Sequence, residues 1–315
     1  MSQSPSEIPR TARIGDLQVH RIGLGTNRLT GPGVLGEPRD PEAAIALLRR
    51  VVELGVDLID TADSYGPFVA ERLIREALHT GGADPYGHVR IATKAGMVRT
   101  GPDSWHALGR PDYLRSCVEW SLQRLDVERL DLLHLHRIDP NVALEDQLGE
   151  LATLQAEGKV RHVGLSQVTV DQLVEARRHL EVVSVQNRLS LVDRSSLDVL
   201  EHCEREGLAF LPWFPLGAGR LATAPPPRLS GVAPNVAAST VALAWLLALS
   251  PRVVPIPGTT STTHLEENLA ALDVRLGSRA RQQLEEWAEA LAIDVAPPAA
   301  AGDGRVPEVV AGRPG

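Results

Sequence analysis

Hydrophobic and polar positions along this chain follow two periods, one typical of buried strands and one typical of amphipathic helices. After a short hairpin over residues 12–21, apolar runs of strand length are followed by segments with helical spacing. The predicted strands cover residues 21–26, 56–61, 89–94, 130–136, 160–166, 182–187, 208–214 and 253–258. The predicted helices include residues 41–54, 112–125, 144–157, 170–180, 195–205 and 237–249. Eight strands with intervening helices predict an α/β fold of the closed (β/α)8 TIM barrel type.

A doubly wound parallel sheet is the competing architecture for alternating strands and helices. It would need a glycine fingerprint after the first strand, and the string GLGTN at 23–27 does not continue to a third glycine before a helix. We therefore favour the barrel, with residues 1–295 as a single domain. Residues 296–315 are rich in Ala, Pro and Gly and are expected to form a flexible C-terminal tail.

Composition and charge narrow the class of protein. At 315 residues and 43% hydrophobic residues, the chain can bury a large core in one barrel. The formal net charge of -8 argues against nucleic acid or an anionic membrane as the main partner. Residues 1–13 lack the apolar core of a signal peptide, and the longest apolar stretch, 241–249, is too short to span a bilayer. The two cysteines fall in separate predicted helices, which fits a reducing, cytoplasmic setting.

Four residues with acid, base or charge chemistry stand at or just after successive predicted strands. Asp60 lies near the end of the second strand, Tyr65 follows in the next loop, Lys94 ends the third strand, and His136 ends the fourth. A phenol has an ordinary pKa near ~10, so Tyr65 needs a neighbouring cation to act as an acid at neutral pH. Because neighbouring strands lie ~4.8 Å apart, Asp60 can hold Lys94 charged and Lys94 can lower the pKa of Tyr65. The arrangement predicts a site that reduces carbonyl groups.

The types and order of these residues resemble the catalytic tetrad of the aldo-keto reductase superfamily. The strings DTADSYG at 60–66, ATKAG at 92–96 and LDLLHLH at 130–136 are similar to its signatures, and the resemblance runs from about residue 21 to residue 268. It implies a metal-independent enzyme that reduces an aldehyde or ketone to an alcohol with a nicotinamide cofactor. Asp60, Tyr65, Lys94 and His136 are then the catalytic residues. Hydride passes to the carbonyl carbon, Tyr65 protonates the oxygen and His136 orients the carbonyl.

Further strings resemble one group within the superfamily, the bacterial pyridoxal reductases or pyridoxine 4-dehydrogenases. These strings are LTGPGVLGEP at 29–38, HRID at 136–139 and PWFPLG at 212–217. The resemblance makes a pyridoxal-like aldehyde one candidate substrate. The loops that shape the pocket, near residues 97–108 and in the C-terminal tail, are where such enzymes differ. The substrate, the direction of reaction and the oligomeric state therefore remain open.

The resemblance also implies contacts to the cofactor from the other strand ends. Ser166, Gln167 and Gln186 carry hydroxyl and amide groups that can bond a carboxamide, and the ring of Trp213 can stack on nicotinamide. The glycine-bearing loop 215–220 allows close approach to a pyrophosphate, and the hydroxyl-rich segment 259–263 opens a helix suited to an adenosine 2′-phosphate. The predicted cofactor residues are Gly25, Thr26, Asp60, Ser166, Gln167, Gln186, Trp213, Phe214, Leu216, Gly217, Gly219, Arg220, Pro257, Gly258, Thr259, Ser261, His264, Glu267 and Asn268.

Three of these positions depart from the pattern common in the superfamily. Gly258 stands where a lysine is common, and His264 stands where an arginine is common. Gln167 occupies a position that is usually asparagine. We expect NADPH rather than NADH as the cofactor, by a smaller margin than in relatives with two basic residues near the 2′-phosphate.

Two other functions are compatible with parts of the sequence. His134 and His136 lie on the same strand face, a spacing that can bind zinc in a metal-dependent barrel hydrolase. The following strands end in Ser166 and Gln186 rather than in further ligands, so we expect no metal site. A non-catalytic cofactor-binding subunit of the same fold is the second alternative, although the intact tetrad favours an enzyme. We expect a small-molecule carbonyl substrate and no nucleic-acid or membrane partner.

Overall fold

A parallel sheet forms the centre of the computed structural model, which describes residues 8–102, 104–223, 225, 227–233 and 235–294. Its strands, in spatial order, are β11, β10, β9, β8, β5, β4 and β3. Their bounds are Leu24–Gly25 for β3, Leu58–Asp60 for β4, Arg90–Ala95 for β5, Leu130–Leu135 for β8, Val160–Ser166 for β9, Val182–Gln186 for β10 and Ala209–Phe210 for β11. All neighbouring strands in this sheet run parallel, so their carboxyl ends meet at one side.

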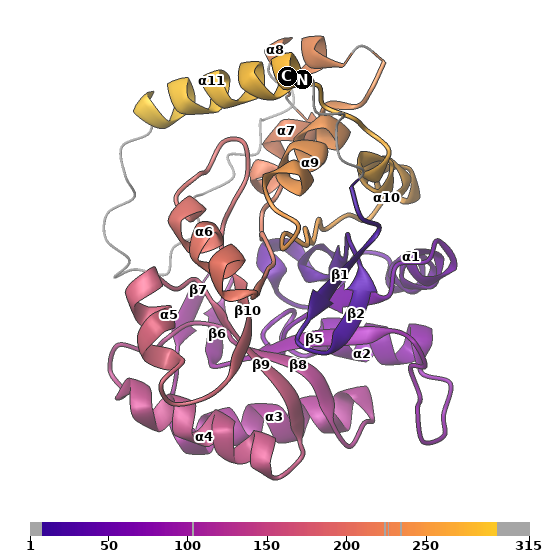
Figure 1. Cartoon of the computed structure of the whole chain (residues 1–315). Coiled ribbons are helices and arrows are strands. Elements are labelled where there is room, and N and C mark those ends of the chain that lie inside the picture. Colours follow the sequence, from indigo (N-terminus) through magenta and orange to yellow (C-terminus); the bar gives the residue numbers. More distant parts are fainter. Residues whose placement is uncertain (1–7, 103, 224, 226, 234, 295–315) are drawn as a thin grey trace.

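Most of the helices lie around the outside of this curved sheet, and the last helices of the chain gather in the upper part of the view (Figure 1). They are α1 (Pro41–Glu53), α2 (Val69–Leu78), α3 (Pro111–Leu125), α4 (Leu144–Ala156), α5 (Val170–Ala176), α6 (Leu197–Glu206), α7 (Arg220–Thr223), α8 (Pro227–Val232), α9 (Ala238–Leu249), α10 (Thr262–Leu269) and α11 (Ser278–Asp294). Single 3-10 turns occur at η1 (Asn27–Leu29), η2 (Pro32–Val34), η3 (Gly217–Gly219) and η4 (Ala270–Leu272).

The start and the buried face of α1 show why these segments become helices. Pro41 occupies the first turn, where its missing N–H is not needed, and the carboxylate of Asp40 accepts from the backbone N–H of Ala43 at 2.9 Å. Its buried residues are Ala44, Leu47, Leu48 and Val51, which recur at helical spacing. The amphipathic pattern therefore places one apolar stripe against the sheet.

The eighth predicted strand, 253–258, does not form a regular strand in the structure. The described residues form a parallel sheet of seven strands, and 253–258 joins its two edges only through separate hydrogen bonds. Val254 donates to the carbonyl of Phe210 at 2.8 Å, and on the other side Gly23 donates to the carbonyl of Pro255 at 2.9 Å. Pro255 and Pro257 have no N–H to donate, so a regular ladder cannot continue through them. The fold is an α/β barrel, and a full set of eight strands is not formed by the residues that the structure describes.

A small antiparallel hairpin covers the inner apolar layer of the sheet. It consists of β1 (Thr11–Ile14) and β2 (Leu17–His20), as predicted. Its buried residues Ile14 and Val19 belong to the same apolar cluster as Leu58, Ala92 and Leu132 of the sheet strands. Side chains alternate in direction along a strand, so the inward residues after these three are Asp60, Lys94 and His134. The hairpin thus covers the apolar layer, and the polar layer of Asp60, Lys94 and His134 lies on the other side of it, toward the carboxyl ends of the strands.

A second hairpin was not predicted. Strands β6 (Met97–Gly101) and β7 (Ser104–Ala107) pair in antiparallel fashion directly after β5, where the sequence suggested only a variable loop. The hairpin begins at the carboxyl end of the sheet, beside the predicted catalytic residues. It therefore contributes a wall to the candidate site.

The predicted domain division is only partly covered by the structure. A single domain over residues 1–295 stays a prediction, and the tail over 296–315 lies outside the described residues. Within the described ranges, no helix combines the length and apolarity needed to cross a bilayer.

Candidate active site

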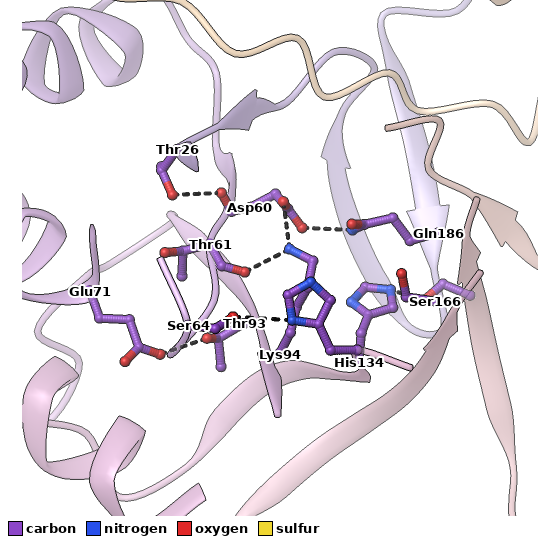
Figure 2. A network of polar contacts seen from close by, with 12 residues as sticks. Thr26, Asp60, Thr61, Ser64, Glu71, Thr93, Lys94, His134, Ser166 and Gln186 are labelled. Atoms are coloured by element: carbon purple, nitrogen blue, oxygen red, sulfur yellow. Dashed lines mark hydrogen bonds and ion pairs between the residues drawn. The ribbon is translucent and has the colours of Figure 1, made fainter. Parts of the chain in front are cut away.

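A buried ion pair lies at the carboxyl ends of β4 and β5. Nζ of Lys94 is 2.7 Å from Oδ2 of Asp60 and also donates to the carbonyl of Thr61 at 2.7 Å. The second carboxylate oxygen of Asp60 accepts from Nε2 of Gln186 at 2.7 Å (Figure 2). Thr26 in turn donates its hydroxyl to the main-chain carbonyl of Asp60 at 3.0 Å. Each charged group in this pair therefore has at least two fixed partners.

Tyr65 lies in the loop after β4, next to this ion pair. Nζ of Lys94 is 5.0 Å from the centre of the phenol ring, and its positive charge favours the ionised form of the phenol. The ring centre of Tyr65 is 6.0 Å from that of His136 and 6.4 Å from that of Trp105, both in edge-to-face geometry. The structure thus brings together the four residues predicted to be catalytic, and it adds Trp105 beside them.

Trp105 was not predicted as a site residue, because it belongs to the hairpin that the sequence did not predict. It lies on β7, with its ring centre 6.1 Å from that of His136. The guanidinium of Arg99, on β6, lies 3.6 Å from the centre of the Trp105 ring. Arg99 also donates to the carbonyls of Gly33, Val34 and Ser64. These bonds tie the hairpin to the loop that carries Tyr65.

Charge and burial set the protonation of the catalytic groups. Burial raises the pKa of the Tyr65 phenol above its ordinary value of 10.0, although the charge of Lys94 opposes the rise. Lys94 lowers this pKa as expected, but the expected net lowering does not result, because removal from water and the negative charge of Asp60 outweigh the lysine. Burial alone would lower the pKa of Lys94, but Asp60 and Tyr65 raise it, so the ammonium stays charged.

His136 is a neutral imidazole. Burial lowers its pKa well below the usual range, and the positive charges of Arg137 and Lys94 lower it further. Its Nδ1 is 3.3 Å from the hydroxyl oxygen of Ser64. If Ser64 donates this bond, the ring hydrogen lies on Nε2, where it can be given to a carbonyl oxygen.

His134 lies in the barrel interior, one residue along the inward face from His136. Its Nε2 is 3.1 Å from the hydroxyl oxygen of Ser184, and burial lowers its pKa to about 3. No group of three or more metal-binding side chains occurs within the described part of the chain. His134 is thus a hydrogen-bonded residue of the barrel interior.

The predicted nicotinamide contacts lie at the ends of β9 and β10 and in the segments that follow β9 and β11. Ser166 and Gln186 are buried at their strand ends, and Gln186 bonds Asp60, a contact that the sequence did not predict. Gln167 accepts from the indole N–H of Trp213 at 3.1 Å, which fixes the orientation of that ring. The ring of Phe214 lies 4.7 Å from that of Trp213.

The predicted phosphate-binding residues lie in two separate segments. Leu216, Gly217 and Gly219 form the turn around η3, and Arg220 is exposed at the start of α7. The other segment contains Pro257, Gly258 and Thr259, and it leads into α10, where Ser261 accepts from the N–H of His264 at 3.3 Å. His264 is exposed, Asn268 is buried, and the carbonyl of Glu267 accepts from Thr240. The main-chain carbonyl of Glu267 therefore faces α9.

Arg28 lies between these two segments and was not predicted. A Cβ placed on Gly219 would be 3.7 Å from its Nη1, and one placed on Gly258 would be 3.4 Å from its Cγ. The Cβ on Gly258 would also lie 2.9 Å from Oδ1 of Asn27, so a lysine cannot enter at position 258 without a shift. Arg28 is exposed and has no ion-pair partner among the described residues. A cation therefore stands beside the glycine turn at 217–219, and its side-chain stem passes Gly258.

Comparisons with known proteins find relatives over most of the chain. The model of the Aldo/keto reductase family matches residues 21–227 and 233–289. An uncharacterized oxidoreductase of Schizosaccharomyces pombe is 50% identical over 278 residues, which cover 88% of this chain and 89% of that protein. Pyridoxine 4-dehydrogenase of Escherichia coli is 38% identical over 284 residues, which cover 87% of this chain and 97% of that protein. A solved aldo-keto reductase from Klebsiella pneumoniae in complex with NADPH has a TM-score of 0.74 at 25% identity, covering 88% of this chain and 94% of that one.

Proposed function

This chain belongs to the aldo/keto reductase family, and we propose that it reduces an aldehyde with NADPH, using Tyr65 as the proton donor. The family match and the oxidoreductase relatives make it an NAD(P)H-dependent oxidoreductase that acts on carbonyl or CH–OH groups. They confirm the resemblance predicted from the sequence. They do not favour a hydrolase or a non-catalytic subunit.

The observation that carries the proposal is the placement of Lys94 between Asp60 and Tyr65. Asp60 holds the ammonium charged, and the ammonium lies beside the phenol that must lose a proton. With its raised pKa, the phenol is fully protonated at neutral pH. It can therefore donate from Oη to the strongly basic alkoxide that forms as the carbonyl is reduced, and Lys94 stabilises the phenolate that remains. Solvent then returns a proton to Tyr65.

His136 orients the carbonyl. A neutral imidazole can donate one hydrogen bond to the carbonyl oxygen without competing with Tyr65 for the proton. The ring contacts with Tyr65 and Trp105 hold the imidazole at a fixed angle.

The residues around the strand ends fit a nicotinamide dinucleotide. Arg28 offers a cation beside the glycine turn at 217–219, and Ser166 offers a hydroxyl for the carboxamide. Trp213, fixed by Gln167, offers a ring face for the nicotinamide. When bound, NADPH supplies the hydride that reduces the carbonyl carbon.

NADPH is preferred to NADH in this proposal. The N-terminus of α10 presents Ser261, Thr262 and Thr263, and His264 lies exposed in its first turn. Backbone N–H groups and hydroxyls at such a terminus favour a phosphate. The NADPH complex of the Klebsiella pneumoniae protein supports the same choice.

We further propose a pyridoxal-like aldehyde as a substrate and the cytoplasm as the location. The 38% identity to pyridoxine 4-dehydrogenase of Escherichia coli supports the substrate. The cysteines Cys117 and Cys203 are buried free thiols, which supports a reducing compartment. We also infer that residues 253–257 take the place of an eighth barrel strand.

A cofactor-consumption screen tests the proposal. Purified protein is mixed with NADPH and a panel of aldehydes and ketones that includes pyridoxal, and the loss of NADPH absorbance is followed. We expect turnover of pyridoxal, and slower turnover when NADH replaces NADPH. If NADPH binds in a fluorescence titration but no carbonyl compound is reduced, the enzyme proposal is wrong and the chain is a cofactor-binding subunit.

A further inference from the structure

Arg137 places a positive charge beside the reacting centre, and the mechanism above does not use it. It follows His136 directly at the carboxyl end of β8 and is partly buried. Its Nη1 donates to the carbonyl of His136 at 2.5 Å and to the hydroxyl of Ser166 at 2.9 Å. Its guanidinium carbon lies 5.4 Å from the centre of the Trp213 ring. The side chain therefore lies across the strand ends between the catalytic histidine and the proposed nicotinamide contacts.

No carboxylate within the described part of the chain neutralises this charge. Among these residues, no Asp or Glu lies within ion-pair distance of Arg137, and the bonds of its guanidinium all leave from Nη1. Arg188 differs in having a counter-ion. Its guanidinium lies 5.3 Å from the same Trp213 ring and pairs with Asp193 at 2.9 Å. Burial lowers the pKa of Arg137 to about 10, so the group still carries its charge at neutral pH.

A partly buried cation without a counter-ion is costly unless a ligand supplies the negative charge. The N–H groups of a guanidinium form a planar fork that matches two oxygen atoms. One nitrogen is held by the carbonyl of His136 and by Ser166, and the other nitrogens form no hydrogen bond with the described residues. The charge of Arg137 acts on both Tyr65 and His136, so the guanidinium lies close to the reacting groups. The ligand that fits is an anionic oxygen close to the reacting carbonyl.

We infer that Arg137 binds an anionic oxygen adjacent to the reacting carbonyl group, so that the enzyme prefers carbonyl substrates with a neighbouring carboxylate or ionised hydroxyl. This inference rests on the proposed reductase function and names the substrate class of the same site. Pyridoxal belongs to this class, because its ring hydroxyl lies ortho to the aldehyde. A 2-oxo acid also belongs to it, because its carboxylate is bonded to the carbonyl carbon.

Matched substrates separate the effect of charge from the effect of reactivity. Phenylglyoxylate and its methyl ester differ in the charge beside the ketone, and pyridoxal and pyridine-4-carbaldehyde differ in the ortho hydroxyl and the other ring substituents. The proteins to compare are wild type, Arg137→Gln, Arg137→Lys and the control Arg178→Gln. Arg178 is a surface residue, with its side chain 70% exposed. Steady-state kcat and KM are measured for all four compounds, and NADPH binding is measured by fluorescence titration.

Arg137→Gln should lower kcat/KM by about 10–100-fold for the anionic member of at least one pair, mainly through KM. The neutral members should change by less than about threefold, Arg137→Lys should retain most of the preference, and NADPH binding should stay unchanged. An effect on phenylglyoxylate alone identifies a carboxylate as the ligand, and an effect on pyridoxal alone identifies a phenolate. Both results support the inference.

Equal losses for charged and neutral members would overturn the inference and make Arg137 a residue that only positions His136 and Ser166. Unchanged ratios in both pairs would overturn it as well. Failure of the proposed function looks different, because wild-type protein would then reduce neither the neutral nor the anionic compounds.

Discussion

The ammonium of Lys94 lies 2.7 Å from Oδ2 of Asp60 on the adjacent strand, and the two side chains are only 1% and 3% exposed. Breaking a pair buried this deeply leaves one charge without solvent or a counter-ion. Lys94 also bonds the carbonyl of Thr61, and Asp60 also bonds Gln186, so three strand ends are joined through the pair. The pair therefore links these strand ends and supplies charge to Tyr65.

Replacing Lys94 by Met should lower the free energy of unfolding by about 3–5 kcal/mol, because Asp60 keeps an unpaired buried charge. Turnover should fall to near background, since no cation then stabilises the phenolate of Tyr65. Urea unfolding and an NADPH oxidation assay measure the two effects. The matched control combines Lys94→Met with Asp60→Asn, which removes both charges and should regain stability without activity. Near wild-type turnover in this double variant would show that the ammonium is dispensable.

Replacing Tyr65 by Phe removes only the hydroxyl, so the fold and NADPH binding should survive. Turnover should fall by ~100-fold or more, the scale expected for a lost general acid. Alcohol oxidation uses the phenolate of Tyr65 as the base. Because the pKa of the phenol is raised, more phenolate forms as pH increases, so wild-type protein should oxidise alcohols faster at higher pH. Initial rates in both directions, with a fluorescence titration of NADPH, check these expectations. Undiminished aldehyde reduction by the variant would mean that another group donates the proton.

Asp63 should make the protein less stable as pH rises from about 4 to about 7. It is buried in the loop that carries Tyr65, its Oδ1 has no hydrogen-bond partner among the described residues, and burial followed by the charge of Glu71 raises its pKa from 3.8 to about 7. In this window the unfolded state loses its proton and the folded state keeps it, so the free energy of unfolding falls with pH. The cost at the upper end is on the order of 4 kcal/mol.

The variant Asp63→Asn cannot titrate, so its stability relative to wild type should improve from about pH 4 to about pH 8. Urea unfolding of both proteins at these two pH values isolates the effect, because the other titrating groups are shared. An equal difference in unfolding free energy at both values would show that Asp63 is already ionised in the folded protein.

Local patterns were sufficient to predict most of the barrel. Pro41 and Pro111 mark the first turns of α1 and α3, where a proline is tolerated, and the apolar faces fix which side meets the sheet. The catalytic residues could be found because parallel strands bring their carboxyl ends together whatever the intervening helices contain. Asp60 and Lys94 therefore meet as their order along the chain implies.

The remaining features depend on contacts between distant parts of the chain. The bond from Gln186 to Asp60 spans 126 residues, and no local pattern predicts which partner the amide chooses. Trp105 reaches the site only because residues 97–107 form a hairpin that folds over it. The Gly-Pro pair at 101–102 is a turn signal, but it does not show which part of the barrel the hairpin contacts. The rise in the pKa of Tyr65 depends on how much water the folded protein excludes, which the order of charged residues does not reveal.

Arg28 should bind the cofactor pyrophosphate. A Cβ placed on Gly219, in the turn at 217–219, would meet Nη1 of Arg28, whereas one placed on Gly258 would meet only its Cγ. The charged end therefore faces the segment predicted to hold the pyrophosphate, which NADPH and NADH share. Arg28→Gln should weaken the binding of both cofactors by a similar factor of about ten.

Fluorescence titrations of wild type, Arg28→Gln and the control Arg178→Gln with each cofactor test this assignment. The difference between Arg28→Gln and wild type should shrink at high salt, because Arg28 is exposed and its charge is screened. Arg178→Gln should bind both cofactors like wild type, since its side chain is a surface group just after α5 and is bonded to Glu175. Weaker binding of NADPH alone would place the guanidinium at the 2′-phosphate instead. The segment at 258–264 would then select the cofactor with an arginine supplied by the loop after β3.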